Sequence, residues 1–121
     1  MRIKNGDLSL DGTDMESNII SEPIWLAHIA YYSIQVVFTG SPDGSFKLQA
    51  SNDEGKNDVE TGQPNITNWT DIEGSTQAIS SSGDHTYSVA DPGYRWVRLV
   101  WTDSSSSSAT ITSARFNVKG A

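Results

Sequence analysis

Apolar and polar residues alternate along several short segments of the chain, and this alternation predicts β-strands. In residues 34–38 every second side chain is large and apolar, and the same period recurs in residues 46–50. Between them, residues 40–44 (GSPDG) place Pro and Gly where a reverse turn accommodates them. We therefore predict that 34–38 and 46–50 form an antiparallel hairpin with one apolar inner face.

Further segments with apolar residues in alternation predict additional strands. They cover residues 8–10, 24–29, 69–73, 76–80, 86–90, 94–102 and 110–119. In the last of these, the residues expected to face the core are Thr112, Ala114, Phe116 and Val118. Segment 94–102 carries large side chains on both faces, which indicates either a central strand covered on two sides or an outer face that meets another subunit.

A helix over residues 24–32 is the alternative to a strand in the N-terminal third. We favour a strand, because Pro23 and the strand that follows leave little room for a helix of ordinary length. Together the segments predict an all-β fold, a single-domain jelly-roll β-sandwich of about eight short antiparallel strands over residues 1–121. Residues 52–68 are polar and predict a long loop insertion, and the serine-rich residues 103–108 predict a flexible tip.

The composition narrows the classes of function. The 121 residues include no cysteine, which excludes disulfides, cysteine-ligated zinc and thiol catalysis. The net charge of −7 argues against nucleic acid as a partner, because phosphate recognition needs clustered Lys and Arg. The most apolar stretch, residues 24–38, is interrupted by polar side chains and is shorter than the roughly 20 residues of a membrane span, so none is predicted.

Charge is distributed unevenly along the chain. Within residues 92–121, Asp103 is the single acidic residue, against Arg95, Arg98, Arg115 and Lys119. Such polarity would orient a subunit against a neighbour of opposite charge. The alternative is that these basic residues occupy the outward positions of two strands in an otherwise acidic domain.

No arrangement of residues predicts catalysis. The histidines, His28 and His85, lack any motif that would pair them with a nucleophile, so we predict that the chain is not an enzyme. Oxygen-rich side chains gather near the N-terminus, where Asp7, Asp11 and Asp14 lie close in sequence with a spacing unlike that of an EF-hand. These aspartates predict a structural Ca²⁺, and no other cofactor is expected.

Four runs of residues, in this order along the chain, resemble the core of discoidin-like (galactose-binding-like) jelly rolls. They are 45–53 (SFKLQASND), 68–73 (NWTDIE), 94–100 (YRWVRLV) and 114–120 (ARFNVKG). The resemblance covers residues 32–120 and implies that Trp69 plugs the core beside the hairpin. The same runs, together with the turn at 38–40 (FTG), also resemble small virion proteins of tailed or membrane-containing bacteriophages.

The leading hypothesis is a structural or accessory protein of a bacteriophage virion. It would be a capsid-associated, decoration or spike subunit, located in the virion, that contacts other virion subunits or itself as a homo-oligomer. The alternative is an extracellular carbohydrate-binding or receptor-recognition module of discoidin-like fold, with a cell-surface glycan as its partner. The candidate ligand-binding or interface residues are Trp25, Tyr31, Tyr32, Val97 and Trp101. For each of them, packing in the core is the competing interpretation.

Overall fold

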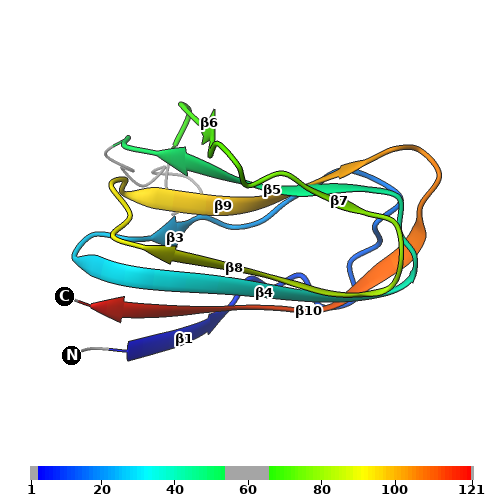
Figure 1. The fold of residues 1–121 in the computed structure, drawn as a ribbon, viewed down its shortest axis with the longest axis horizontal. Helices are drawn as coiled ribbons and strands as arrows, with labels where there is room; N and C mark the ends of the chain where they lie inside the picture. Colours follow the sequence, from blue (N-terminus) through cyan, green and yellow to red (C-terminus); the bar gives the residue numbers. More distant parts are fainter. Residues whose placement is uncertain (1–2, 54–65, 121) are drawn as a thin grey trace, which may run out of the picture.

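The computed structural model describes residues 3–53 and 66–120, which form β-strands joined by turns and loops (Figure 1). In chain order the strands are β1 (Ile3–Asp7), β2 (Ile19–Ile20), β3 (Ile24–Trp25), β4 (Ile29–Ser41), β5 (Gly44–Ser51), β6 (Thr70–Asp71), β7 (Gln77–Ile79), β8 (Gly83–Ala90), β9 (Trp96–Asp103) and β10 (Ser108–Gly120). The predicted all-β class is confirmed. Nothing in these two segments is a helix that could cross a membrane.

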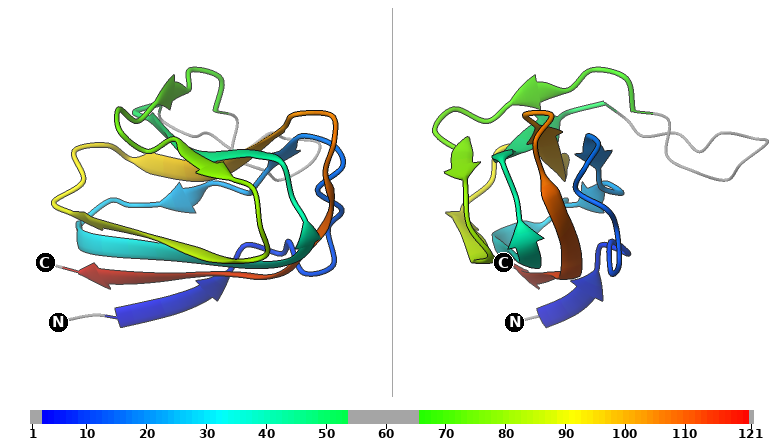
Figure 2. Two further views of the ribbon diagram at one scale, coloured as in Figure 1. Left: turned by 45° about the vertical axis from the view of Figure 1, so that its right-hand side comes forward. Right: turned by 90° about the vertical axis from the view of Figure 1, so that its right-hand side faces the viewer.

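The strands form two antiparallel sheets that pack face to face (Figures 1 and 2). The first sheet has the order β1-β10-β4-β8. In the second, β9 and β5 are central; β2 and β3 pair with β9, and β6 and β7 pair with β5. If β2 with β3 and β6 with β7 are each taken as one interrupted strand, the pairing order is that of a jelly roll. The predicted β-sandwich is therefore confirmed.

A buried serine fills the gap in each interrupted strand. Between β2 and β3, the Leu99 N–H donates to Ser21 Oγ at 2.8 Å. Between β6 and β7, the Leu48 N–H donates to Ser75 Oγ at 3.0 Å. In both places the hydroxyl replaces a strand carbonyl as the acceptor, so the central strands keep these buried N–H groups paired where the edge strand bends away.

The predicted hairpin of residues 34–38 with 46–50 is wrong. β4 pairs with β10 and β8, whereas β5 pairs with β9, β6 and β7, so the turn between β4 and β5 carries the chain from one sheet to the other. The apolar faces of the two strands still meet, because Phe38 and Phe46 pack across the core with ring centroids 5.7 Å apart.

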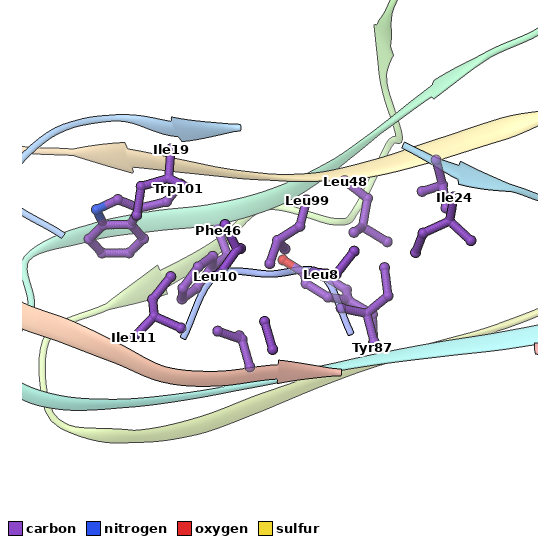
Figure 3. Close-up of a cluster of buried hydrophobic side chains, with 14 of the residues drawn as sticks. Leu8, Leu10, Ile19, Ile24, Phe46, Leu48, Tyr87, Leu99, Trp101 and Ile111 are labelled. Carbon is purple, nitrogen blue, oxygen red and sulfur yellow. The ribbon is translucent and has the colours of Figure 1, made fainter. Parts of the chain in front are cut away.

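The core lies between the sheets and is closed by the segment that follows β1 (Figure 3). Leu8 and Leu10, predicted to form a short strand, instead follow β1 in an irregular segment and are buried there together with Met15. Phe46 from the second sheet packs against Trp101, with ring centroids 4.7 Å apart. Figure 3 shows side chains from both sheets and from this segment converging on one apolar cluster.

β10 contains a bulge that reverses which of its residues face the core. The register with β4 shifts after Ile111, so Thr112 is exposed and its Oγ1 donates to Val37 O at 3.2 Å. The prediction that Thr112 faces the core is wrong, because one extra residue moves the period of two by one position. Beyond the bulge, the predicted inward residues do pack on the core: Ala114, Phe116 and Val118.

The serine-rich tip, predicted to be flexible, is anchored to the turn between β4 and β5. Ser107 Oγ donates to Asp43 O at 2.9 Å, and the Ser104 N–H donates to the same oxygen at 2.9 Å. In return the Asp43 N–H donates to Ser107 Oγ at 2.8 Å. Of the predicted loop insertion at 52–68, residues 54–65 lie outside the described residues.

Candidate binding site

Three of the predicted ligand-binding or interface residues lie in the core. Tyr32 and Val97 are each 0% exposed and Trp101 is 1% exposed. Tyr32 Oη lies 2.6 Å from Tyr94 Oη, and burial raises the pKa of the Tyr32 hydroxyl. Trp101 Nε1 donates to Met15 O at 3.0 Å. For these three candidates the competing interpretation, packing in the core, is the one observed, because the register of β4 and β9 turns their side chains between the sheets.

Tyr31 and Trp25 are the candidates that reach the surface. Tyr31 is half-buried, and Lys119 Nζ lies 5.5 Å from its ring centroid. Trp25 is 48% exposed and packs against Trp96, with ring centroids 4.7 Å apart and an interplanar angle of 58°. Trp96 is buried, and its Nε1 donates to Asp53 O at 3.2 Å. A fixed indole therefore supports the exposed one.

Trp25 belongs to a cleft of about 680 Å³ that opens between the edges of the two sheets. The cleft lies at the end of the sandwich where both termini are found (Figure 1). Its other walls come from β1, β9, β10 and the turn that leads into β4. The lining residues are Lys4, Pro23, Ile24, Trp25, Ala27, His28, Ile29, Trp96, Phe116, Val118 and Gly120.

A tight turn between β3 and β4 shapes one wall of this cleft. The Ile29 N–H donates to Leu26 O at 3.1 Å, and the Leu26 N–H donates to Arg95 O at 2.7 Å, which ties the turn to the segment before β9. Within the turn, His28 adopts a positive φ of 62°. This left-handed conformation is uncommon for a residue with a side chain and is often found at binding sites. The turn places His28 in the cleft lining.

The lining combines aromatic, apolar and basic side chains. Among the described residues that form it, Lys4 and His28 are the ones with an ionisable group, and none carries a carboxylate. An exposed indole face beside hydrogen-bond donors in an apolar cleft suits a flat ring that carries hydroxyl groups. The sequence indicated Trp25 as a candidate site residue but not Lys4 or Trp96. No local pattern shows that β1, β3 and β9 contribute to the same cleft.

Trp69 lies on the outer face of the second sheet, so the implied plug of the core is wrong. The Arg98 guanidinium carbon lies 4.1 Å from the Trp69 ring centroid, and Arg98 Nε donates to Gln49 Oε1 at 2.8 Å. Desolvation lowers the pKa of Arg98. The outer face of β9 is thus covered by Trp69 and, further along, by Trp25. Segment 94–102 thus contains a central strand, β9, as one of its two interpretations expected, and part of its outer face is covered.

Asp53 joins the described segments on either side of residues 54–65. Its carboxylate accepts hydrogen bonds from the Asn68 N–H at 2.9 Å, from Asn68 Nδ2 at 3.1 Å and from the Thr67 N–H at 2.9 Å. These bonds, those from Asn68 first, lower the pKa of the Asp53 carboxyl. The backbone carbonyl of Asp53 accepts the hydrogen bond from Trp96 Nε1. Asp53 therefore links the segment at 67–68 to a residue of the cleft lining.

The three N-terminal aspartates, predicted to bind Ca²⁺, do not form a common cluster, although two of them meet at Arg115. Arg115 forms two hydrogen bonds to Asp11, at 2.8 and 2.9 Å, and one to Asp7 at 3.0 Å. The guanidinium holds the pKa of the Asp11 carboxyl below its usual range. Asp14 accepts the Glu16 N–H at 2.8 Å. Within residues 3–53 and 66–120, no group of three or more His, Cys, Asp or Glu is placed to hold a metal ion. An arginine, supplied by β10, pairs with two of these carboxylates instead.

No protein-family model matches the chain, and no curated protein matches it. Among solved structures, the SPBc2 prophage-derived protein YomS is similar over 97% of this chain and 92% of its own, with 12% identity and a TM-score of 0.50. Chitosan-binding module 2 of a Paenibacillus sp. IK-5 chitosanase/glucanase, solved with chitotriose, has 14% identity, 98% and 95% coverage and a TM-score of 0.49. The Tobacco streak virus coat protein has 11% identity, 99% and 86% coverage and a TM-score of 0.48.

At these identities the likeness concerns the fold alone. The chain has a β-sandwich fold of the kind seen in YomS.

Proposed function

We propose that this chain is a non-enzymatic module that binds a saccharide in the Trp25 cleft. The observation that supports the proposal is that Trp25, 48% exposed, lies on a cleft of about 680 Å³. A ligand that covers the exposed indole removes apolar surface from water, which favours binding. The apolar faces of sugar rings stack on indoles, while their hydroxyl groups take the surrounding donors and acceptors.

The cleft is also preorganised for such a ligand. Its volume is within the range of small-molecule sites, about 300–1,000 Å³. Trp25 rests on Trp96, and Trp96 is hydrogen-bonded to Asp53 O, so the platform needs no rearrangement before a ring stacks on it. Binding to a rigid site avoids the loss of conformational entropy that ordering a loop would bring.

A saccharide array followed by isothermal titration calorimetry tests this proposal. We expect Trp25→Ala to weaken binding of any saccharide found by at least about tenfold, which corresponds to about 1.4 kcal/mol. Ile20→Ser is the matched control, because Ile20 is 58% exposed on the neighbouring edge strand but does not line the cleft. Circular dichroism of both variants checks the fold. An array without a single ligand, or equal affinities for Trp25→Ala and the unaltered chain, would refute the proposal.

A second function, the virion subunit predicted first from the sequence, is favoured by a different observation. Within the described residues, Ile20 and Trp25 are the large hydrophobic residues that are exposed, and both lie on the edge strands that pair with β9. Ile20 is paired with Val100, which is 7% exposed, so its side chain extends an apolar strip across the sheet edge. Such strips on edge strands mark contacts between proteins. In this role the chain would be located in a bacteriophage particle and contact other subunits or a second copy of itself.

Oligomeric state and capsid binding test the second function. Size-exclusion chromatography with light scattering should show an assembly that Ile20→Ser dissociates, or the chain should sediment with capsids in a manner that Ile20→Ser abolishes. Trp25→Ala serves as the comparison, since it removes the saccharide platform and leaves Ile20 in place. A chain that stays monomeric and does not bind capsids at any concentration tested would refute this role.

A further inference from the structure

The charges at the cleft differ in sign from those of the chain as a whole. The sequence contains 15 acidic and 8 basic residues, for a net charge of −7. In the cleft, by contrast, Lys4 and His28 are the ionisable residues of the described lining, and no Asp or Glu is present. Because salt screens charges beyond about 10 Å, the groups in the wall decide the local potential more than the distant acids do. The ionisable side chains in the wall of the cleft are therefore basic, although the chain as a whole is acidic.

Lys4 occupies a position that is expected to hold an apolar residue. It is paired with Val118, which is 5% exposed, so its side chain leaves β1 on the side of the sheet that faces the core. The next residue on this side, Gly6, lies opposite Phe116, and both Phe116 and Val118 line the cleft. Lys4 is exposed and lines the cleft, where a lysine covers apolar surface with its aliphatic part and keeps its ammonium in contact with water.

The Lys4 ammonium has no carboxylate partner among the described residues. The ion pairs found there join Lys47 to Asp71 and Arg115 to Asp7 and Asp11. Glu22, the acidic residue nearest in sequence to the β3 wall, is exposed and does not line the cleft. A cation that is not neutralised within its own protein is available to bind an anionic ligand.

His28 adds a hydrogen-bonding side chain to the lining. Its positive φ of 62° is fixed by the hydrogen bond from the Ile29 N–H to Leu26 O. A glycine would adopt this conformation without strain, whereas a histidine is strained there. The turn therefore holds a hydrogen-bond donor in the lining at a position where the backbone alone would favour glycine.

We infer that the Trp25 cleft binds an acidic saccharide, one whose ring carries a carboxylate. The ring stacks on Trp25, and the carboxylate accepts a charge-assisted hydrogen bond from the Lys4 ammonium. This inference rests on the proposed saccharide-binding function and names its ligand class. A neutral saccharide would leave the ammonium partly desolvated without a counter-charge, which is unfavourable.

Calorimetry with matched ligand pairs tests the inference. The probes are methyl glucoside with methyl glucuronide, and lactose with sialyllactose. In the unaltered chain we expect the acidic member of at least one pair to bind about tenfold or more tightly than the neutral member, with a preference that decreases as salt is added. Lys4→Gln should abolish the preference, and Lys4→Arg should retain it.

Lys119→Gln is the charge-matched control. It removes one positive charge from β10, but Lys119 lies against Tyr31 and does not line the cleft, so the preference should persist. If neutral and acidic members bind equally, or if Lys4→Gln and Lys119→Gln act alike, the inference is wrong while saccharide binding stands. If no saccharide binds at all, the proposed function fails and the inference with it. Tighter binding of an acidic peptide, such as a hexaglutamate probe, than of any acidic saccharide would also overturn it, in favour of a protein partner.

Discussion

Replacing Gly6 by alanine should destabilise the fold and disturb the cleft. Gly6 lies on β1 directly opposite Phe116 on β10. A Cβ atom at Gly6 would lie 2.1 Å from Phe116 Cζ, 2.4 Å from Cε1 and 2.7 Å from Cε2. The ring therefore covers the glycine and would have to move away from it. Since Phe116 lines the cleft, its displacement would change the cleft as well.

Gly6→Ala should change the free energy of unfolding in the opposite direction from the same substitution at an unobstructed strand position. Glycine in a strand is usually less stable than alanine by about 0.5–1 kcal/mol, so the substitution would otherwise be favourable. Overpacking against a fixed neighbour costs about 1–3 kcal/mol. We therefore expect Gly6→Ala to lower the free energy of unfolding by about 0.5–2 kcal/mol and the melting temperature by about 2–8 °C for a chain of this size.

A double-mutant cycle measured by urea denaturation gives the decisive comparison. In a Phe116→Ala background the obstruction is absent, so Gly6→Ala should become stabilising and the coupling between the two positions should reach about 1–3 kcal/mol. An unchanged m-value in all variants would show that the unfolded state is not the source of the difference. The reasoning fails if Gly6→Ala stabilises the otherwise unaltered chain, or if the two substitutions are additive.

Two further substitutions probe contacts that hold separate parts of the fold together. Tyr87 Oη, on β8 of the first sheet, donates to Ser75 O beside the second sheet at 2.7 Å, so Tyr87→Phe should lower the free energy of unfolding in urea by about 1–2 kcal/mol; an unchanged value would refute this. The pKa of Asp53 is lowered in the fold by hydrogen bonds from Asn68 and Thr67, so its contribution to stability is present above its ordinary value of 3.8 and is lost as the pH falls through the lower folded value. The stability difference between Asp53→Asn and the unaltered chain should shrink below pH 3.8 in pH-dependent unfolding, and a difference constant with pH would contradict this account.

The candidate site was only partly predictable from the sequence. Trp25 was a candidate from the sequence, and it is both exposed and part of the cleft lining. Trp101 and Val97 gave the same local signal and yet are buried. Both faces of β9 carry large side chains, so alternation alone does not say which face is inside. Pairing with β5 on one side and with β2 and β3 on the other fixes that choice.

The N-terminal aspartates show the same limit for charge. Local spacing brought Asp7, Asp11 and Asp14 together as candidates for Ca²⁺. Arg115, the partner of Asp7 and Asp11, is separated from Asp11 by 104 residues and reaches it only because β10 pairs with β1. A charge that arrives through strand pairing has no local signal, so sequence reasoning does not anticipate it.

The sequence by itself determined that the chain is all-β, where most strands lie and which face of β4 and β5 is buried. These properties follow from a period of two within a few residues, which is local information. Only the tertiary structure decided which strands pair, that β4 and β5 belong to opposite sheets, where the bulge of β10 reverses its face and which residues line the cleft. Alternation specifies which side of a strand is buried. It does not specify the neighbouring strand, because an apolar face is removed from water equally well by any other apolar face of the core. The choice among them depends on closing both sheets around one shared core, a condition that involves the whole chain at once.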